Sequence, residues 1–178
     1  TYLGVEDFCV LNALRSNGRY EGSYEGVAKR IRDFVSPEQV SPALEQLFAT
    51  VAFCCAIENG DAHLKNFAVV YENAESIVSL APAYDLVCTT FYESQDCLAL
   101  TLDDSKSFPT SRALAAFALR HCDLPAAKVK KILQRISGSM DRARSEIRDY
   151  IERHADFARA GEHLIGRFEH GLHRLELI

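Results

Sequence analysis

The sequence lacks the features that would direct it to a membrane or out of the cell. No stretch of its 178 residues approaches the roughly 18 consecutive apolar residues that a membrane-spanning helix needs. The first residues also lack the basic segment followed by an apolar segment that is typical of a signal peptide. We therefore expect a cytoplasmic protein with no membrane partner.

Internal repeats, low-complexity tracts and C-x-x-C pairs are also missing. Among the six cysteines, Cys54 and Cys55 are adjacent within an apolar run, which favours reduced thiols in the core over a disulfide framework. A hydrophobic content of 48% and a charged content of 25% are ordinary for one globular domain. The net charge of −5 argues against a surface that coats nucleic acid, although it leaves room for a local basic face.

The spacing of apolar residues predicts a mostly helical chain with a few strands. The expected helices cover residues 5–14, 24–35, 42–58, 111–121, 126–137, 140–157 and 161–176, and the expected strands cover 67–71, 76–80 and 98–102. The helix at 42–58 is the most apolar, so we expect it to lie at the centre, with Ser36 or Ser41 as its cap. The fold class is therefore α+β and predominantly α-helical.

The most informative feature is the segment 59–66, which reads NGDAHLKN, followed by Ala83-Tyr84-Asp85. Protein kinases place an Asp that receives the substrate hydroxyl five residues before an Asn that holds magnesium, and a later Asp that also holds the metal. Asp61 and Asn66 have this spacing. A hairpin formed by the strands at 67–71 and 76–80 would return Asp85 to Asn66, so the sequence predicts a phosphoryl-transfer site.

These motifs resemble the C-terminal kinase lobe of the HipA family, serine/threonine kinases that are the toxins of bacterial toxin–antitoxin pairs. The segment NGDAHLKNF and the later LAPAYDLVCT carry the resemblance, and the opening VEDFC and the segment LALTL support it more weakly. The resemblance implies a protein-kinase-like C-terminal lobe over residues 1–178, with a short β-hairpin that carries the metal loop.

The resemblance also implies roles, cofactors and partners. Asp61 would be the catalytic Asp, while Asn66 and Asp85 would bind Mg²⁺ and, through it, ATP. The γ-phosphoryl group would pass to a serine or threonine of a protein, which in the best-known member is an aminoacyl-tRNA synthetase, the glutamyl-tRNA synthetase. A small HipB-like antitoxin would be the partner and would link the kinase to operator DNA indirectly.

The chain departs from a complete kinase in one respect. It has no glycine-rich loop between strands and no lysine on a preceding strand that could pair with nucleotide phosphates. We expect the nucleotide-binding N-terminal lobe to be absent from these residues. The hypothesis that follows is that they bind ATP poorly and have little kinase activity alone.

Two further residues inside the motif each have a catalytic and a structural interpretation. His63 is a candidate catalytic residue, although a packed histidine that orders the loop explains it better. Lys65 is a candidate contact for the transferred phosphate, and a solvated lysine is the alternative. Tyr84 is expected to anchor the metal loop. A hydrolase metal site at Asp61 and His63 lacks a further histidine at suitable spacing.

Two other function classes stay open, a small-molecule phosphotransferase of the aminoglycoside-kinase type and a non-catalytic module that binds an antitoxin or an operator complex. A basic cluster bears on the second class. Its members are Lys128, Lys130, Lys131, Arg135, Arg142, Arg144 and Arg148. Such a cluster is typical of a solvated helix face, and a surface for phosphate or an acidic partner is the alternative reading.

Overall fold

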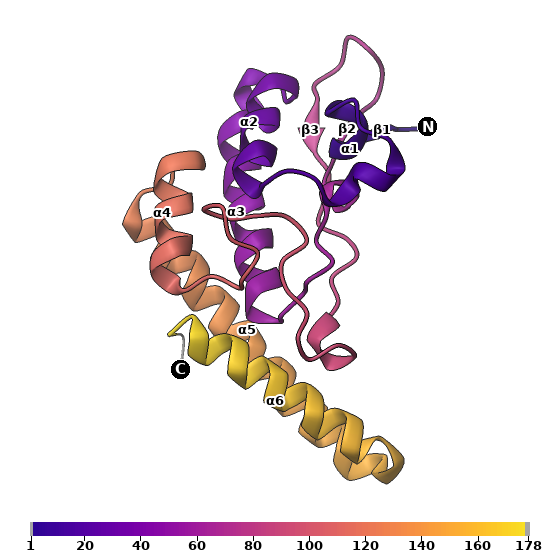
Figure 1. Cartoon of the computed structure of the whole chain (residues 1–178), viewed down its shortest axis with the longest axis vertical. Coiled ribbons are helices and arrows are strands. Elements are labelled where there is room, and N and C mark those ends of the chain that lie inside the picture. Colours follow the sequence, from indigo (N-terminus) through magenta and orange to yellow (C-terminus); the bar gives the residue numbers. More distant parts are fainter. Residues whose placement is uncertain (1, 177–178) are drawn as a thin grey trace.

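The computed structural model describes residues 2–176 and has a small antiparallel sheet at one end of a helical body (Figure 1). The strands are β1 (Gly4–Asp7), β2 (Ala68–Tyr71) and β3 (Ser79–Leu80), and the α-helices are α1 (Phe8–Leu11), α2 (Tyr24–Phe34), α3 (Val40–Ala56), α4 (Ser111–His121), α5 (Ala126–Arg153) and α6 (Ala158–Arg174). Short 3-10 turns join them, of which Ser16–Tyr20, Leu64–Asn66 and Thr89–Phe91 matter below. The chain is mostly helical, as predicted.

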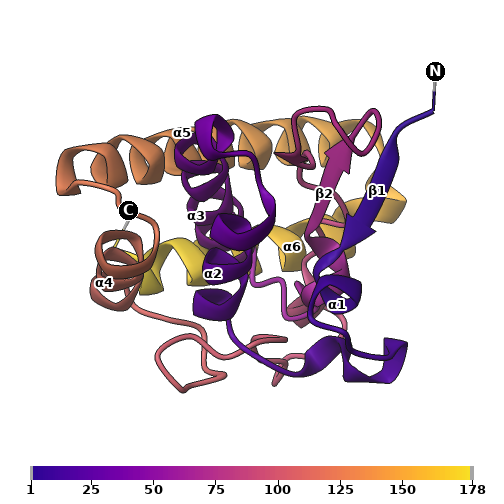
Figure 2. The ribbon, with the colours of Figure 1, turned by 90° about the horizontal axis from the view of Figure 1, so that it is seen from above.

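Helix α3 is the central element, as its composition predicts. Nine of its residues are buried, from Ala43 to Ala56, and it lies between α2 and α5 in the view from above (Figure 2). Pro42 is tolerated because it lies in the first turn, where amide groups have no intrahelical partner. The expected serine cap is wrong, because the Ser36 hydroxyl instead accepts a hydrogen bond from the Val78 amide, 2.9 Å away. Ser36 thereby ties the start of this region to the hairpin.

The predicted hairpin is present as β2 and β3, paired through Val69 with Leu80 and Val70 with Ser79, although the second strand is limited to two of the five residues expected at 76–80. The prediction of a helix over residues 5–14 is wrong in its first part, because residues 4–7 form β1, which pairs with β2. Only four residues that follow are helical, and the Asp7 carboxylate caps them by accepting from the Val10 amide at 2.9 Å. Asp7 therefore marks the change from strand to helix.

The predicted strand at 98–102 is not formed, although its apolar residues are buried as a strand's would be. Leu98, Leu100 and Leu102 are all at most 3% exposed. Their backbone groups find partners in turns, since the Leu98 amide donates to Lys106 and the Leu102 amide donates to Ser105. The apolar pattern of this segment is therefore explained by its burial in the core and not by pairing with a neighbouring strand.

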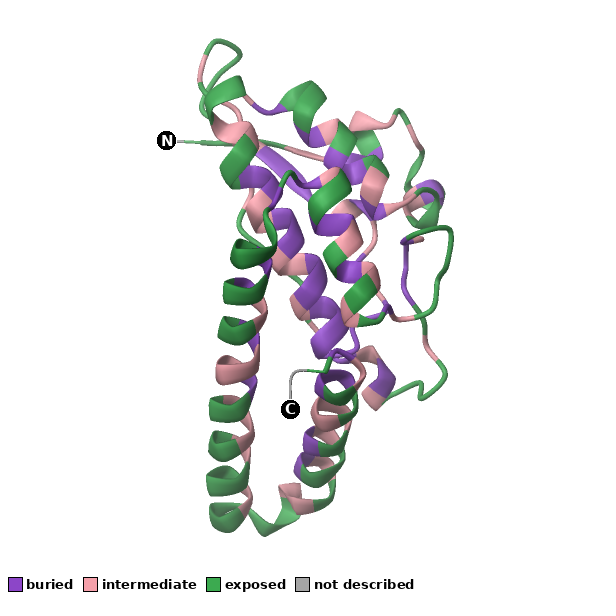
Figure 3. Cartoon of the chain, turned by 90° about the vertical axis from the view of Figure 1, so that its left-hand side faces the viewer, coloured by how far each residue is buried: buried purple, intermediate pink, exposed green. Residues whose placement is uncertain are grey.

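The predicted break near Gly138 is also wrong, because α5 continues through it as one helix of 28 residues. Ile136 and Met140 on either side are buried, so packing holds the helix across the glycine. Helices α5 and α6 form an antiparallel pair that extends beyond the body, with exposed residues along its outer surface (Figure 3). Among residues 2–176, no helix has the length and apolar character needed to cross a membrane.

Two glycines of α6 provide a stability test of this packing. A Cβ atom on Gly171 would lie 2.1 Å from the Ala56 carbonyl oxygen, whereas one on Gly166 would meet nothing within 4 Å. Gly171→Ala should therefore destabilise the protein by about 2 kcal/mol, because α6 must shift away from α3. Gly166→Ala should stabilise it by up to about 1 kcal/mol through helix propensity. Urea unfolding measures both, and equal effects would contradict the close approach.

Candidate functional site

The loop that follows α3 is held by the side chain of Asn59, which is fully buried. Its Oδ1 atom accepts from the Asp61 amide at 2.9 Å, and its Nδ2 atom donates to the Asp85 carbonyl at 3.4 Å. The Gly60 amide donates to the Thr89 hydroxyl at 2.7 Å. A Cβ atom at Gly60 would lie 2.4 Å from the Cys97 carbonyl oxygen, so this position needs glycine. Two segments distant in sequence are thus fixed together.

Asp61 and Asn66 are linked through the backbone between them. The His63 amide donates to the Asp61 carbonyl at 2.8 Å and to the Asn66 Oδ1 atom at 2.9 Å. The Asp61 side chain accepts at Oδ1 from the Tyr20 hydroxyl, 2.7 Å away. Asp61 is only partly buried, so its carboxylate can be reached from solvent.

Asn66 and Asp85 meet directly, as the hairpin prediction requires. The Asn66 Nδ2 atom donates to the Asp85 Oδ2 atom at 2.7 Å. Asp85 has a φ of +56°, a left-handed conformation that is uncommon for residues other than glycine. Such strain persists only where the surroundings determine it, and here Asn59 and Asn66 both hold the residue.

Three other residues singled out from the sequence lie around this pair. The His63 ring packs edge-on against Tyr20, with ring centroids 5.1 Å apart. The Lys65 ammonium lies 3.3 Å from the Asp7 carboxylate, so in this structure it is directed toward β1. The Tyr84 hydroxyl donates to the Lys65 carbonyl at 2.5 Å. Burial and the charges of Asp7 and Asp85 raise the pKa of Tyr84, which keeps this hydroxyl protonated as a donor.

The oxygens of Asn66 and Asp85 fit a hard cation. In the described residues, Asp85 keeps Oδ1 without a hydrogen-bond partner, and a carbonyl oxygen such as Asn66 Oδ1 has a second lone pair. Mg²⁺ is commonly bound by one or two protein oxygens and completes its shell with water and substrate phosphates. Within residues 2–176, no group of three or more His, Cys, Asp or Glu residues is arranged to hold a metal ion.

Glu58 supports the loop that carries Asp61, and the sequence interpretation missed it. Its side chain is 1% exposed and has four partners: Arg167, His170, Arg174 and Thr90. Burial raises its pKa, but the hydrogen bonds from Arg174, His170 and Thr90 and the charge of Arg167 outweigh that effect, so the pKa of Glu58 is lowered. Since Glu58 directly precedes Asn59, these contacts join α6 to the loop. The feature of the sequence that could have identified Glu58 is a single acidic residue at the end of the most apolar helix.

The cysteines lie mostly in the interior of the protein. All six cysteines are free, and only Cys97 is exposed. Burial raises the pKa of the Cys54 thiol to about 12, which makes it a poor nucleophile.

Within the basic cluster, Lys128 pairs with Glu45, and Arg144 and Arg148 both pair with Glu169. The cluster is therefore partly neutralised.

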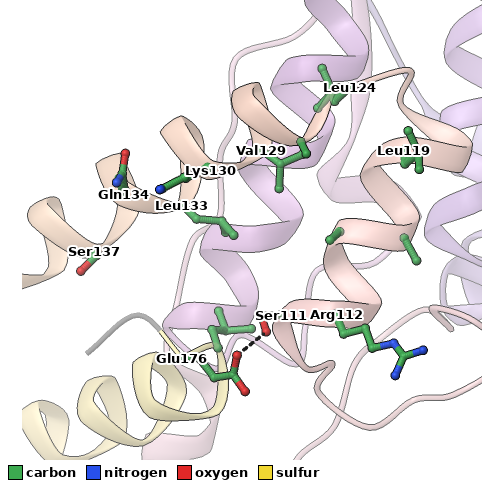
Figure 4. Close-up of a pocket in the computed structure, with 14 residues that line it drawn as sticks. Ser111, Arg112, Leu119, Leu124, Val129, Lys130, Leu133, Gln134, Ser137 and Glu176 are labelled. Carbon is green, nitrogen blue, oxygen red and sulfur yellow. Dashed lines mark hydrogen bonds between the residues drawn. The ribbon is translucent and has the colours of Figure 1, made fainter.

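One hollow of the structure lies away from Asp61. It is a groove of about 740 Å³ between α4, α5 and the end of α6, lined largely by aliphatic side chains such as Leu119 and Leu133 (Figure 4). A hydrogen bond of 3.0 Å from the Ser111 hydroxyl to Glu176 closes one end. A second hollow of about 460 Å³ is lined by Ala83 and Leu86, next to Asp85.

Comparisons with known proteins give the family and the fold that this chain resembles. The family model described as the HipA-like C-terminal domain matches residues 1–144. A Sinorhizobium fredii protein named "Putative kinase Y4dM" is 29% identical over 131 residues, which are 72% of this chain and 30% of that protein.

A solved structure matches the fold over almost the whole chain. It is the complex of HipA, HipB and operator DNA from the Shewanella oneidensis MR-1 toxin–antitoxin system, with a TM-score of 0.72 and 23% identity. The match covers 97% of this chain and 44% of the solved one. This likeness shows a shared fold. The chain spans less than half the length of either relative.

Proposed function

Because the family model matches residues 1–144, the chain belongs to the HipA-like C-terminal domain family, and from that premise we propose that it forms the catalytic part of a serine/threonine protein kinase. The observation that carries the proposal is the contact of Asn66 with Asp85, in a loop that also fixes Asp61. Asp61 and Asn66 have the residue types and the five-residue spacing of the protein-kinase catalytic loop, and Asp85 is a later Asp of the kind that holds the metal.

The proposed roles follow from the chemistry of the three side chains. Asp61 accepts the proton of the acceptor hydroxyl, and its partial exposure allows that hydroxyl to approach. Asn66 and Asp85 would hold Mg²⁺, which supplies positive charge against the phosphates of ATP when it is bound. His63 and Lys65 support the loop, through the contacts with Tyr20 and Asp7. Catalysis would rest on positioning and charge neutralisation.

The partners are part of the same proposal. We propose a HipB-like antitoxin as the protein that controls this kinase, with operator DNA reached only through it. The support is the fold shared with a chain of the complex that contains HipA, HipB and operator DNA. The phosphorylated protein, for which an aminoacyl-tRNA synthetase is the candidate, is a matter for substrate profiling.

The direct test is transfer of labelled phosphate from [γ-³²P]ATP by the protein as its gene encodes it. With Mg²⁺ and a protein extract, we expect label on serine or threonine residues after acid hydrolysis, and no label when EDTA is present. Label on an aminoglycoside, with none on protein, would favour the small-molecule phosphotransferase. No transfer to either, with an antitoxin still bound, would favour the non-catalytic module.

Asp85→Asn tests the magnesium role through binding. The variant removes one negative charge from the proposed metal ligands, so the Mg²⁺ concentration for half-maximal binding of a non-hydrolysable ATP analogue should rise by about tenfold. Isothermal titration calorimetry at several Mg²⁺ concentrations measures it. Asp149→Asn, at an exposed position on α5, is the matched control and should behave like the wild type. An unchanged Mg²⁺ dependence would contradict the role of Asp85.

A further inference from the structure

The hydroxyl of Tyr20 is the only described group hydrogen-bonded to the Asp61 carboxylate, with 2.7 Å between Oη and Oδ1. The backbone of Asp61 is held separately, by Asn59 and by the His63 amide. The orientation of the carboxylate itself therefore depends on a residue that lies 41 positions earlier in the chain. Without such a partner, the terminal torsion of an aspartate is broad and roughly two-fold.

Tyr20 is itself held on two sides of its ring. The Arg19 guanidinium lies 4.7 Å from the ring centroid, and the His63 ring packs edge-on at 5.1 Å. The tyrosine is 39% exposed and lies at the end of the Ser16–Tyr20 turn.

We infer that Tyr20 is a positioning residue for Asp61, an inference that rests on the proposed kinase function. By occupying Oδ1, the phenol fixes the plane of the carboxylate and leaves Oδ2 for the proton of the acceptor hydroxyl. A general base needs one oxygen for the proton and a fixed orientation for efficient transfer. Tyr20 supplies the orientation without contacting the reacting atoms.

Tyr20→Phe is the test, because it removes the hydroxyl and keeps the ring between Arg19 and His63. We expect kcat to fall by about tenfold, as one charge-assisted hydrogen bond is lost, while KM for ATP and for the acceptor stays within about twofold. Tyr71→Phe is the matched control, since the Tyr71 hydroxyl donates to the Glu6 carboxylate at 2.8 Å on the sheet. That control should leave kcat unchanged.

A double variant separates positioning from a general structural role. If Tyr20 acts through Asp61, Tyr20→Phe should cause no further loss in an Asp61→Asn background. A full additional tenfold loss there would overturn the inference. So would a kcat for Tyr20→Phe equal to or above that of the wild type, because a faster variant would mean that the phenol blocks Asp61.

The same assays distinguish this inference from the proposed function. If Asp61→Asn keeps wild-type activity, the proposed function is wrong and the role of Tyr20 falls with it. If Asp61→Asn is inactive and Tyr20→Phe matches the wild type, only the role of Tyr20 is wrong. Thermal unfolding of each variant, expected within a few degrees of the wild type, shows that the loss in kcat is not a loss of folded protein.

Discussion

Replacing Asp61 with asparagine is expected to lower kcat for phosphoryl transfer by about a thousandfold, within the range that a general base contributes. The amide keeps an Oδ1 atom that can accept from Tyr20, and the backbone bonds of Asp61 to Asn59 and His63 do not involve the side chain. The loop should therefore keep its shape. What is lost is the oxygen that can take the proton of the acceptor hydroxyl, together with one negative charge.

Single-turnover transfer from labelled ATP measures the loss, and binding of an ATP analogue shows whether the nucleotide still binds. We expect affinity for the analogue to change by less than about threefold, because Asn66 and Asp85 are intact and Asp61 acts on the acceptor. Asp104→Asn is the matched control, at an exposed turn where asparagine tolerates the φ of +58°. An Asp61→Asn variant with more than about a tenth of wild-type activity would exclude Asp61 as the base.

The hairpin and the central helix could be predicted from the sequence because their signals are local. A polar break between two apolar runs predicts a hairpin, and that hairpin returns the chain toward Asn66, where Asp85 follows. The apolar composition of α3 likewise predicts a buried helix wherever it packs. The proximity of the two metal-ligand candidates, although not their hydrogen bond, could therefore be predicted before any tertiary contact was known.

The residues that support the site could not be predicted in this way. Tyr20 reaches Asp61 across 41 positions, and Arg174 reaches Glu58 across 116. No local pattern encodes such contacts, because they exist only once the Ser16–Tyr20 turn has packed on the Leu64–Asn66 turn and α6 has packed on α3. The errors at β1 and at residues 98–102 have a related cause. Over four or five residues, apolar spacing does not determine whether the backbone joins a sheet, a helix or a turn.

Glu58 illustrates how contacts between segments distant in sequence hold the fold together. Its Oε1 atom accepts from Arg174 at 2.7 Å and from His170 at 2.6 Å, and its Oε2 atom accepts from Thr90 at 2.9 Å. Arg174 also donates to the Cys55 carbonyl at 2.6 Å, so it holds both the backbone and the side chain at the end of α3. The carboxylate is thus a junction between α6 and the loop that carries Asp61.

Glu58→Gln should destabilise the protein by about 3 kcal/mol, because it leaves two guanidinium groups without their shared carboxylate. We place the value at the low end of the range for broken buried pairs, since the Arg167 and Arg174 side chains are 20% and 18% exposed and keep some contact with water. Asp33→Asn is the control. It removes a surface pair with Arg30 and should change stability by less than about 0.5 kcal/mol.

The pH dependence of the stability difference between the wild type and Glu58→Gln shows whether the buried charge causes it. Because the pKa of Glu58 is lowered in the folded state, its ionised form stabilises the protein above the unfolded-state pKa of about 4.3, and that stability is lost as pH falls through the lower folded value. Urea unfolding of the wild type and of Glu58→Gln should therefore show the full difference at pH 7 and a shrinking one below about pH 4. A difference that stays constant down to pH 3 would mean that shape, and not the buried charge, makes Glu58 necessary.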